Sequence, residues 1–215
     1  MPGRFPFAGI DVGGSSKGFH LVGLCDGDEI TSFRASTPDQ AVEKIKQWST
    51  ISVAIDAPIS WAKDGKSRAC ERALEVSGIR CFKTPSRNLA GEKPFYDWVK
   101  HGLMLYDALR AAGYYSICKP EGLRQEKILM ETFPHAIATR LQGARPRDLS
   151  KVVFRRAVLR CQEVDETALS NIDFVDAALC ALIARLFFRG GMNDLDRPGG
   201  DHCGMLIPIR SSPPN

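Results

Sequence analysis

Three short apolar runs of this chain each end on an acidic residue. The runs are Phe7-Ala8-Gly9-Ile10-Asp11, Val53-Ala54-Ile55-Asp56 and Ile128-Leu129-Met130-Glu131. Short apolar runs bounded by turn-forming residues are typical of buried strands. We therefore predict one sizeable core of α/β type, in which each acid lies at the C-terminal tip of a strand.

The first 56 residues predict a β-β-β-α-β order. The turns Gly13–Gly18 and Asp26–Asp28 separate strands that end near Val12, Cys25 and Ala35. Thr37-Pro38 supplies a helix N-cap and a first-turn proline, and a buried strand over 51–55 follows the helix. The chain is thus expected to begin with a three-stranded meander, one helix and a fourth strand.

The remaining residues predict a largely helical second part within a single domain over 1–215. Residues 58–122 have a looser pattern and are interpreted as an inserted helical segment. After the strand that ends at Glu131, helices are expected from Pro134, over 149–163 and over 173–188. Residues 205–209 are expected to form a late strand, whose proline favours a sheet edge.

Composition restricts the class of protein. No apolar stretch is long and uncharged enough to span a bilayer, so no membrane partner is expected. The N-terminus has no secretory signal pattern, and the seven cysteines are scattered without a C-x-x-C pair, which favours the cytoplasm. The net charge of +4 is compatible with a polyanionic partner.

A pair of acidic residues also stands at the start of the last long helix. Asp173 and Asp176 lie one turn apart on one face, and no further charge follows until Arg185. Taken singly, Asp11, Asp56 and Glu131 have an ordinary alternative role as turn or cap residues, and Asp173 has one as a first-turn acid. Asp176 has no such ready alternative, because it lies a turn further into an otherwise apolar helix. Together, carboxylates at strand ends predict a site for Mg²⁺ or Mn²⁺, ions that prefer oxygen ligands and assist phosphoryl chemistry.

An ordered set of motifs resembles one known family. The motifs are Gly9-Ile10-Asp11-Val12-Gly13, Ala54-Ile55-Asp56-Ala57-Pro58, Arg68-x-x-Glu71, Glu131-Thr132-Phe133-Pro134 and Asp173-x-x-Asp176-Ala177. From Ile10 to Leu206-Ile207-Pro208 the chain is similar to the family catalogued as domain of unknown function 429, described as predicted nucleases. The resemblance implies a ribonuclease-H-like mixed sheet flanked by helices.

The resemblance also implies the composition of an active site. Asp11, Asp56 and Asp176 would be its catalytic, metal-binding carboxylates, and Asp173-x-x-Asp176 is similar to the last-helix acids of Holliday-junction resolvases. We expect Asp11 to bridge two Mg²⁺ or Mn²⁺ ions, with Asp56 completing the ligand set of one ion and Asp176 that of the other. Asp173 is a further expected metal ligand, and Glu131 is a further expected catalytic residue although it lies on a fifth strand.

A nuclease also needs positive charge to hold phosphates. Arg87, Lys151, Arg155 and Arg156 are the expected nucleic-acid contacts, the last three on the basic helix over 149–163. A solvated helix face is the alternative interpretation of that helix. The predicted function is therefore metal-dependent hydrolysis of phosphodiester bonds in nucleic acid.

Two other functions start from the same fold. The turn Gly13-Gly14-Ser15-Ser16-Lys17 is similar to the phosphate-binding turn of small-molecule kinases in the actin-like ATPase superfamily. Those enzymes duplicate the fold unit, and no second turn of this kind follows here. The other alternative is an inactive ribonuclease-H-like binding module, against which the retention of every expected acid argues.

Overall fold

The computed structural model describes residues 4–27, 29–117, 126–190, 192–200 and 204–209. Its strands are β1 (Phe7–Val12), β2 (Phe19–Leu24), β3 (Ile30–Ala35), β4 (Ser52–Asp56), β5 (Tyr115–Ser116), β6 (Ile128–Glu131), β7 (Leu195–Asp196) and β8 (Ile207–Pro208). Its helices are α1 (Pro38–Gln47), α2 (Ala69–Val76), α3 (Arg87–Ala90), the 3₁₀ helix η1 (Pro94–Tyr96), α4 (Asp97–Ala111), α5 (Pro134–Gln142), α6 (Lys151–Cys161) and α7 (Ile172–Gly190).

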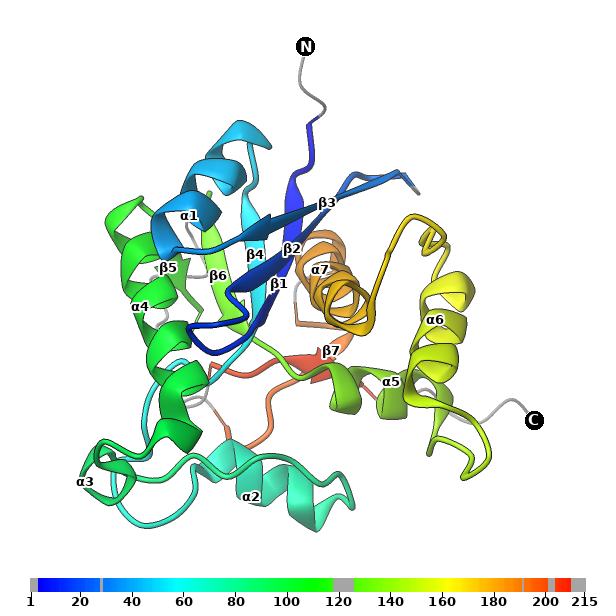
Figure 1. Cartoon of the computed structure of the whole chain (residues 1–215). Coiled ribbons are helices and arrows are strands. Elements are labelled where there is room, and N and C mark those ends of the chain that lie inside the picture. Colours follow the sequence, from blue (N-terminus) through cyan, green and yellow to red (C-terminus); the bar gives the residue numbers. More distant parts are fainter. Residues whose placement is uncertain (1–3, 28, 118–125, 191, 201–203, 210–215) are drawn as a thin grey trace.

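Within the described residues, six strands form one mixed sheet in the order β3-β2-β1-β4-β6-β5. β1, β2 and β3 are antiparallel neighbours, whereas β1, β4, β6 and β5 run parallel. Figure 1 shows this sheet with α1 and α4 on one side and α7 on the other. The predicted mixed α/β sheet flanked by helices is confirmed, and its strand order is consistent with a ribonuclease-H-like fold.

The two faces of the sheet carry separate cores because side chains alternate along each strand. Phe7 and Ala54 belong to the core that faces α5, α6 and α7. Ile10 and Ile55 belong to the core on the opposite face, which includes residues of α1 and α4. This alternation decides which of the strand-end acids can meet.

Gly9 sets how closely α7 approaches the sheet. A Cβ atom at Gly9 would lie 1.9 Å from the carbonyl oxygen of Ala177 and 2.2 Å from the amide nitrogen of Ala181. Those distances are far inside van der Waals contact, so only glycine allows α7 to lie directly on β1. The consequence is that the first turn of α7 lies over the end of β1.

The segment over 58–122 contributes to the core as well as to the surface. Helix α4 buries Leu105, Tyr106 and Leu109 in the core that faces α1, and the short strand β5 extends the sheet beside β6. A Cβ atom at Gly102 would lie 2.6 Å from the Cβ of Ala57, which shows how closely α4 covers the end of β4. The end of this segment, residues 118–122, lies outside the described residues.

The predicted late strand is present as β8, which pairs antiparallel with β7 in a separate two-stranded sheet.

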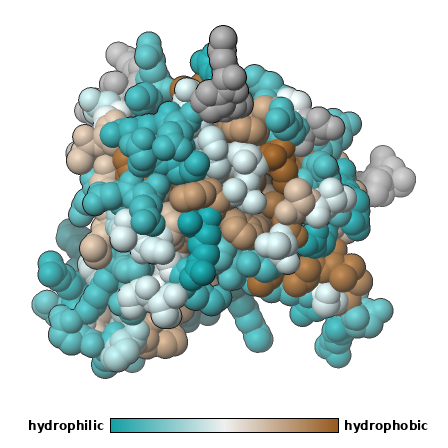
Figure 2. All heavy atoms as spheres, turned by 45° about the horizontal axis from the view of Figure 1, so that its top comes forward, coloured by the Kyte–Doolittle hydropathy of each residue, from teal (hydrophilic) through white to brown (hydrophobic). Residues whose placement is uncertain are grey.

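The molecular face in Figure 2 has hydrophilic and hydrophobic residues interspersed. In the part of the chain that the structure describes, no helix combines the length and the apolar character that crossing a membrane requires.

Candidate metal centre

The ends of β1 and β4 bring two carboxylates together. Asp11 is in register with Asp56 across the parallel pair and with His20 across the antiparallel pair of β1 and β2. Asp11 follows Gly9 by two residues, and Asp56 follows Ala54 by two, so both project to the face that α7 covers. The sequence-based expectation that these acids share one site agrees with this register.

The N-terminal part of α7 adds Asp173, in its first turn, and Asp176, one turn further on. The helix begins where the side chain of Asn171 accepts a hydrogen bond from the Phe174 amide at 3.0 Å, as an N-cap does. Asp176 immediately precedes Ala177, whose backbone lies against Gly9. The close packing at Gly9 therefore places these two helix acids next to Asp11.

The four acids interact electrostatically. Burial and the negative charges of Asp176 and Asp173 raise the pKa of Asp11 to about 7. Loss of solvation, followed by the charges of Asp11 and Asp176, raises the pKa of Asp56 well above its ordinary range. Carboxylates held this close repel one another when ionised, so the cluster favours a bound cation or a retained proton.

Positive side chains neutralise the two helix acids. Arg155 Nη1 and Lys151 Nζ donate to the two oxygens of Asp176, the lysine at 3.1 Å. Lys17 Nζ lies 3.2 and 3.4 Å from the oxygens of Asp173. Arg155 is buried, whereas the side chains of Lys17 and Lys151 are more than half exposed, so only the lysines are readily accessible to a ligand.

His20 is a site residue that the sequence analysis does not identify. Its imidazole, the Asp11 carboxylate and the Asp173 carboxylate each offer one ligand atom, and these atoms lie within 4.8 Å of one another. Burial lowers the pKa of His20, which favours the neutral, metal-binding form. The pairing of His20 with Asp11 follows from the hairpin register around the Gly13–Gly18 turn, which is the signal that could have found it.

Two of the expected nucleic-acid contacts lie elsewhere. Arg156 donates to the backbone carbonyls of Glu166 and Leu169, the former at 2.6 Å, and so fixes the loop before α7. Arg87 is the first residue of α3 and lines a separate surface hollow together with Trp61 and Lys100. The structure thus brings Lys151 and Arg155 to the carboxylates but not these two arginines.

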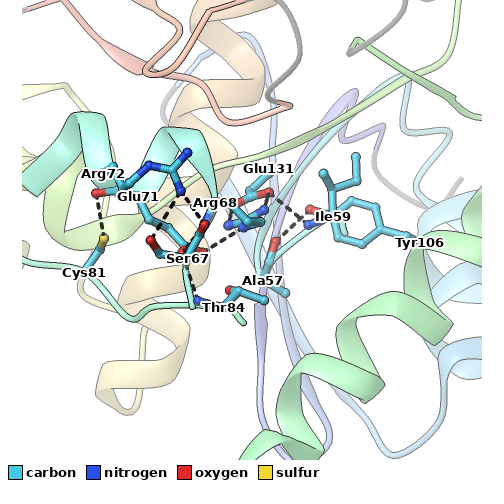
Figure 3. A network of polar contacts seen from close by, with 10 residues as sticks. All are labelled: Ala57, Ile59, Ser67, Arg68, Glu71, Arg72, Cys81, Thr84, Tyr106 and Glu131. Atoms are coloured by element: carbon cyan, nitrogen blue, oxygen red, sulfur yellow. Dashed lines mark hydrogen bonds and ion pairs between the residues drawn. The ribbon is translucent and has the colours of Figure 1, made fainter. Parts of the chain in front are cut away.

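Glu131 projects to the other face of the sheet. It is in register with Ile55, not with Asp56, and Ile55 belongs to the core on the α4 side. Its two carboxylate oxygens accept hydrogen bonds from Arg68 at 2.5 and 2.6 Å, and one also accepts the Ile59 amide at 2.9 Å (Figure 3). In this arrangement Glu131 binds protein groups and is 1% exposed.

Arg68 links Glu131 to a second buried acid. Arg68 Nε donates to Glu71 at 2.7 Å, and the amides of Arg68 and Thr84 also donate to that carboxylate (Figure 3). The network fixes the backbone that follows Asp56, because Glu131 holds Ile59 while the Tyr106 hydroxyl donates to the carbonyl of Ala57 at 3.0 Å. The Arg68-x-x-Glu71 and Glu131 motifs therefore hold Asp56 in position through the backbone that follows it.

The Gly13–Gly18 turn contacts the start of α4. The Ser15 amide donates to the Asp97 carboxylate at 2.6 Å. A Cβ atom at Gly14 would lie 2.8 Å from the same carboxylate oxygen. An acidic side chain of the protein thus lies against the turn at the position where a kinase of the actin-like superfamily would hold phosphate.

Comparison with known proteins adds one finding. Residues 9–197 match the family model described as "Protein of unknown function (DUF429)". The chain belongs to this family. The match covers every acid of the candidate site, from Asp11 to Asp176, and also His20, Arg68 and Glu131. No curated protein and no solved structure matches the chain.

Proposed function

We propose that this DUF429 protein is a metal-dependent hydrolase that cleaves phosphodiester bonds in nucleic acid. The observation that carries the proposal is the meeting of Asp11, Asp56, Asp173 and Asp176 at the ends of two parallel strands and one helix. Four carboxylates gathered in one partly buried site are costly to hold together unless a cation compensates them.

The residues present fit a divalent ion. Asp11 is central to the cluster, and Asp56, Asp173, Asp176 and His20 surround it with oxygen and nitrogen donors. A bound ion would supply charge to polarise a phosphate and would make water a better nucleophile. That Asp11 bridges two ions, which Asp56 and Asp176 each complete, stays a prediction.

The chain's own side chains would supply the remaining chemistry. The Asp56 carboxylate would accept the proton of the attacking water, because loss of solvation and the neighbouring acids raise its pKa and make it a stronger base than an ordinary carboxylate. At the exposed edge of the cluster, Lys17 would turn its ammonium group from Asp173 to the phosphate oxygens of a substrate, and Lys151 would donate to the same oxygens while it stays beside Asp176. The Glu131, Arg68 and Glu71 network would keep Asp56 in place.

Nucleic acid is the proposed substrate class because the cations next to the acids suit a phosphate backbone. Arg87 and Arg156 are retained as proposed contacts only for the outer parts of a long substrate. A cytoplasmic location is part of the proposal, supported by the scattered cysteines; those within the described residues form no disulfide with one another.

The contact between Ser15 and Asp97 favours hydrolysis over kinase chemistry. A phosphate-binding turn must present its amides to the nucleotide. Here the Ser15 amide already donates to a carboxylate, whose negative charge would also repel a phosphate. This observation supports the nuclease over the small-molecule kinase.

The test is cleavage of labelled DNA and RNA oligonucleotides, single- and double-stranded, with Mg²⁺, Mn²⁺ or EDTA. We expect cleavage that depends on the metal and falls by more than about 100-fold in Asp11→Asn and Asp176→Asn, because each change removes a group of the reacting site. Asp39→Asn, an exposed acid on α1, is the matched control and should cleave normally. Equal cleavage by Asp11→Asn and the parent would refute the proposal.

A further inference from the structure

His20 has a buried imidazole that lacks the hydrogen bonds a buried polar ring normally makes. The residue is 5% exposed, and its Nδ1 atom has no hydrogen-bond partner among the described residues. Its Nε2 atom faces Asp173 Oδ2 at 3.9 Å, too far for a hydrogen bond. The ring of Phe174 packs edge-on against the imidazole, with centroids 4.9 Å apart, and so fixes its orientation. Buried polar atoms without partners are rare and call for an explanation.

The donors around His20 have nearly the spacing of ligands on one ion. Ligand atoms about 2.1 Å from an octahedral ion lie about 3 to 4.2 Å from one another. The atoms of Asp11, His20 and Asp173 are all within 4.8 Å, so small side-chain rotations close the set. The ammonium group of Lys17 already contacts both oxygens of Asp173, and its side chain is 62% exposed and can withdraw.

Asp176, by contrast, already has its counter-charge from the protein. The guanidinium of Arg155 stays charged at all relevant pH values, and its side chain is 7% exposed beside the carboxylate that it binds. Lys151 holds the other oxygen at 3.1 Å. A second divalent ion on Asp176 would have to lie against this buried positive charge or displace it.

From these contacts we infer that the centre takes one first-row transition ion, bound by Asp11, His20 and Asp173, and that Arg155 and Lys151 occupy the place of a second ion at Asp176. Imidazole donors suit Zn²⁺, Fe²⁺ and Ni²⁺, and Mn²⁺, the first-row ion used as the probe below, accepts a mixed set of carboxylate and imidazole donors more readily than Mg²⁺, which prefers oxygen ligands throughout. The inference deepens the proposed function and rests on it for the role of the ion in catalysis. It differs from the two-ion arrangement that the sequence predicts.

The experiment measures metal binding, not cleavage. Titration calorimetry with Mn²⁺ and with Mg²⁺ gives stoichiometry and affinity, and pulsed electron paramagnetic resonance of the Mn²⁺ complex detects a directly bound nitrogen. We expect one Mn²⁺ per chain, a ¹⁴N coupling in the spectrum, and weaker binding of Mg²⁺. His20→Ala and Asp173→Asn should each weaken Mn²⁺ binding by more than about tenfold, and His20→Ala should also remove the ¹⁴N coupling.

The matched control is His101→Ala. His101 also has a buried Nδ1 atom without a partner among the described residues, but it stacks on Phe19, which belongs to the core on the opposite face of the sheet. This variant should keep the parent's stoichiometry and ¹⁴N signal. Thermal unfolding shows whether each variant is folded, and His20→Asn, which retains a polar side chain, replaces the alanine variant if that one unfolds.

Two results would overturn the inference: two tightly bound Mn²⁺ ions per chain, or a ¹⁴N coupling that is absent from the parent or persists without His20. Either result combined with metal-dependent cleavage would leave the proposed function standing. One Mn²⁺ with a ¹⁴N coupling that depends on His20, but no cleavage of any nucleic acid, would support this metal site and reject the nuclease.

Discussion

The raised pKa of Asp11 predicts how the stability of the metal-free protein depends on pH. Its ordinary value is 3.8 and its value in the folded protein is about 7. At about 1.36 kcal/mol for each pKa unit, this difference corresponds to at most about 4 kcal/mol. A raised carboxyl pKa means that the folded state binds the proton more tightly than the unfolded state does. The stabilisation that the proton on Asp11 gives the folded state is therefore complete below pH 4 and is lost as the pH rises to about 7.

Asp11→Asn removes this titration while keeping the size of the side chain. We expect the variant to be more stable than the parent in EDTA at pH 8, by about 2 to 4 kcal/mol, because relaxation and sharing of protons with Asp56 reduce the full value. The advantage should shrink towards pH 4.5, where the parent retains its proton. Adding Mn²⁺ at pH 8 should reverse the order, because only the parent gains from tight binding.

The assay is urea unfolding at several pH values between 4.5 and 8.5, with Asp39→Asn as the control for loss of an exposed acid. A stability difference between Asp11→Asn and the parent that is the same at every pH would refute the reasoning. So would a variant that is less stable than the parent at pH 8 in EDTA.

Three further outcomes follow from particular contacts. Arg68→Met should lower the free energy of unfolding by about 3 to 5 kcal/mol, since Glu71 and Glu131 would stay buried without their partner; urea unfolding measures this, and an unchanged midpoint would contradict it. Gly9→Ala should lower the free energy of unfolding by about 1 to 3 kcal/mol or more and weaken Mn²⁺ binding, because the added methyl group pushes α7 away from β1. Mn²⁺ binding equal to the parent's would show that the position of α7 does not determine the metal site. Lys151→Ala should weaken oligonucleotide binding and reduce its dependence on salt, whereas Lys44→Ala, on the last turn of α1, should not; equal salt slopes for both would remove Lys151 from the interface.

The sequence was sufficient for the elements that carry the strand-end acids. Apolar runs that end in Asp11 and Asp56 predict buried strands with an acid at each tip, and the turn residues predict the meander that begins with the first of them; the structure adds that the two strands are parallel neighbours. Glu131 shows where this reasoning stops. A terminal acid has the same appearance in each run, but the register of β6 against β4 places Glu131 beside Ile55 and so on the other face. Such register depends on tertiary packing that one strand's sequence does not record.

The basic helix α6 illustrates a second limit. Its basic residues were expected to contact a ligand. The sequence of a helix does not show which of its charged side chains pair with a buried acid on another helix. Arg155 is buried against Asp176, Arg156 holds backbone carbonyls, and Lys151 alone of the three keeps its side chain largely exposed. The two-residue strand β5 also escaped prediction, because an element this short has no periodicity to detect.

The metal centre is tested most directly by the anomalous diffraction of Mn²⁺ in a crystal of the protein grown at neutral pH. We expect a strong peak within bonding distance, about 2.2 Å, of the Asp11 carboxylate, with His20 and Asp173 completing the ligand set and Asp56 adjacent. No peak at this cluster in saturating Mn²⁺, with Lys17 still bound to Asp173, would contradict the claim that these carboxylates form a metal centre.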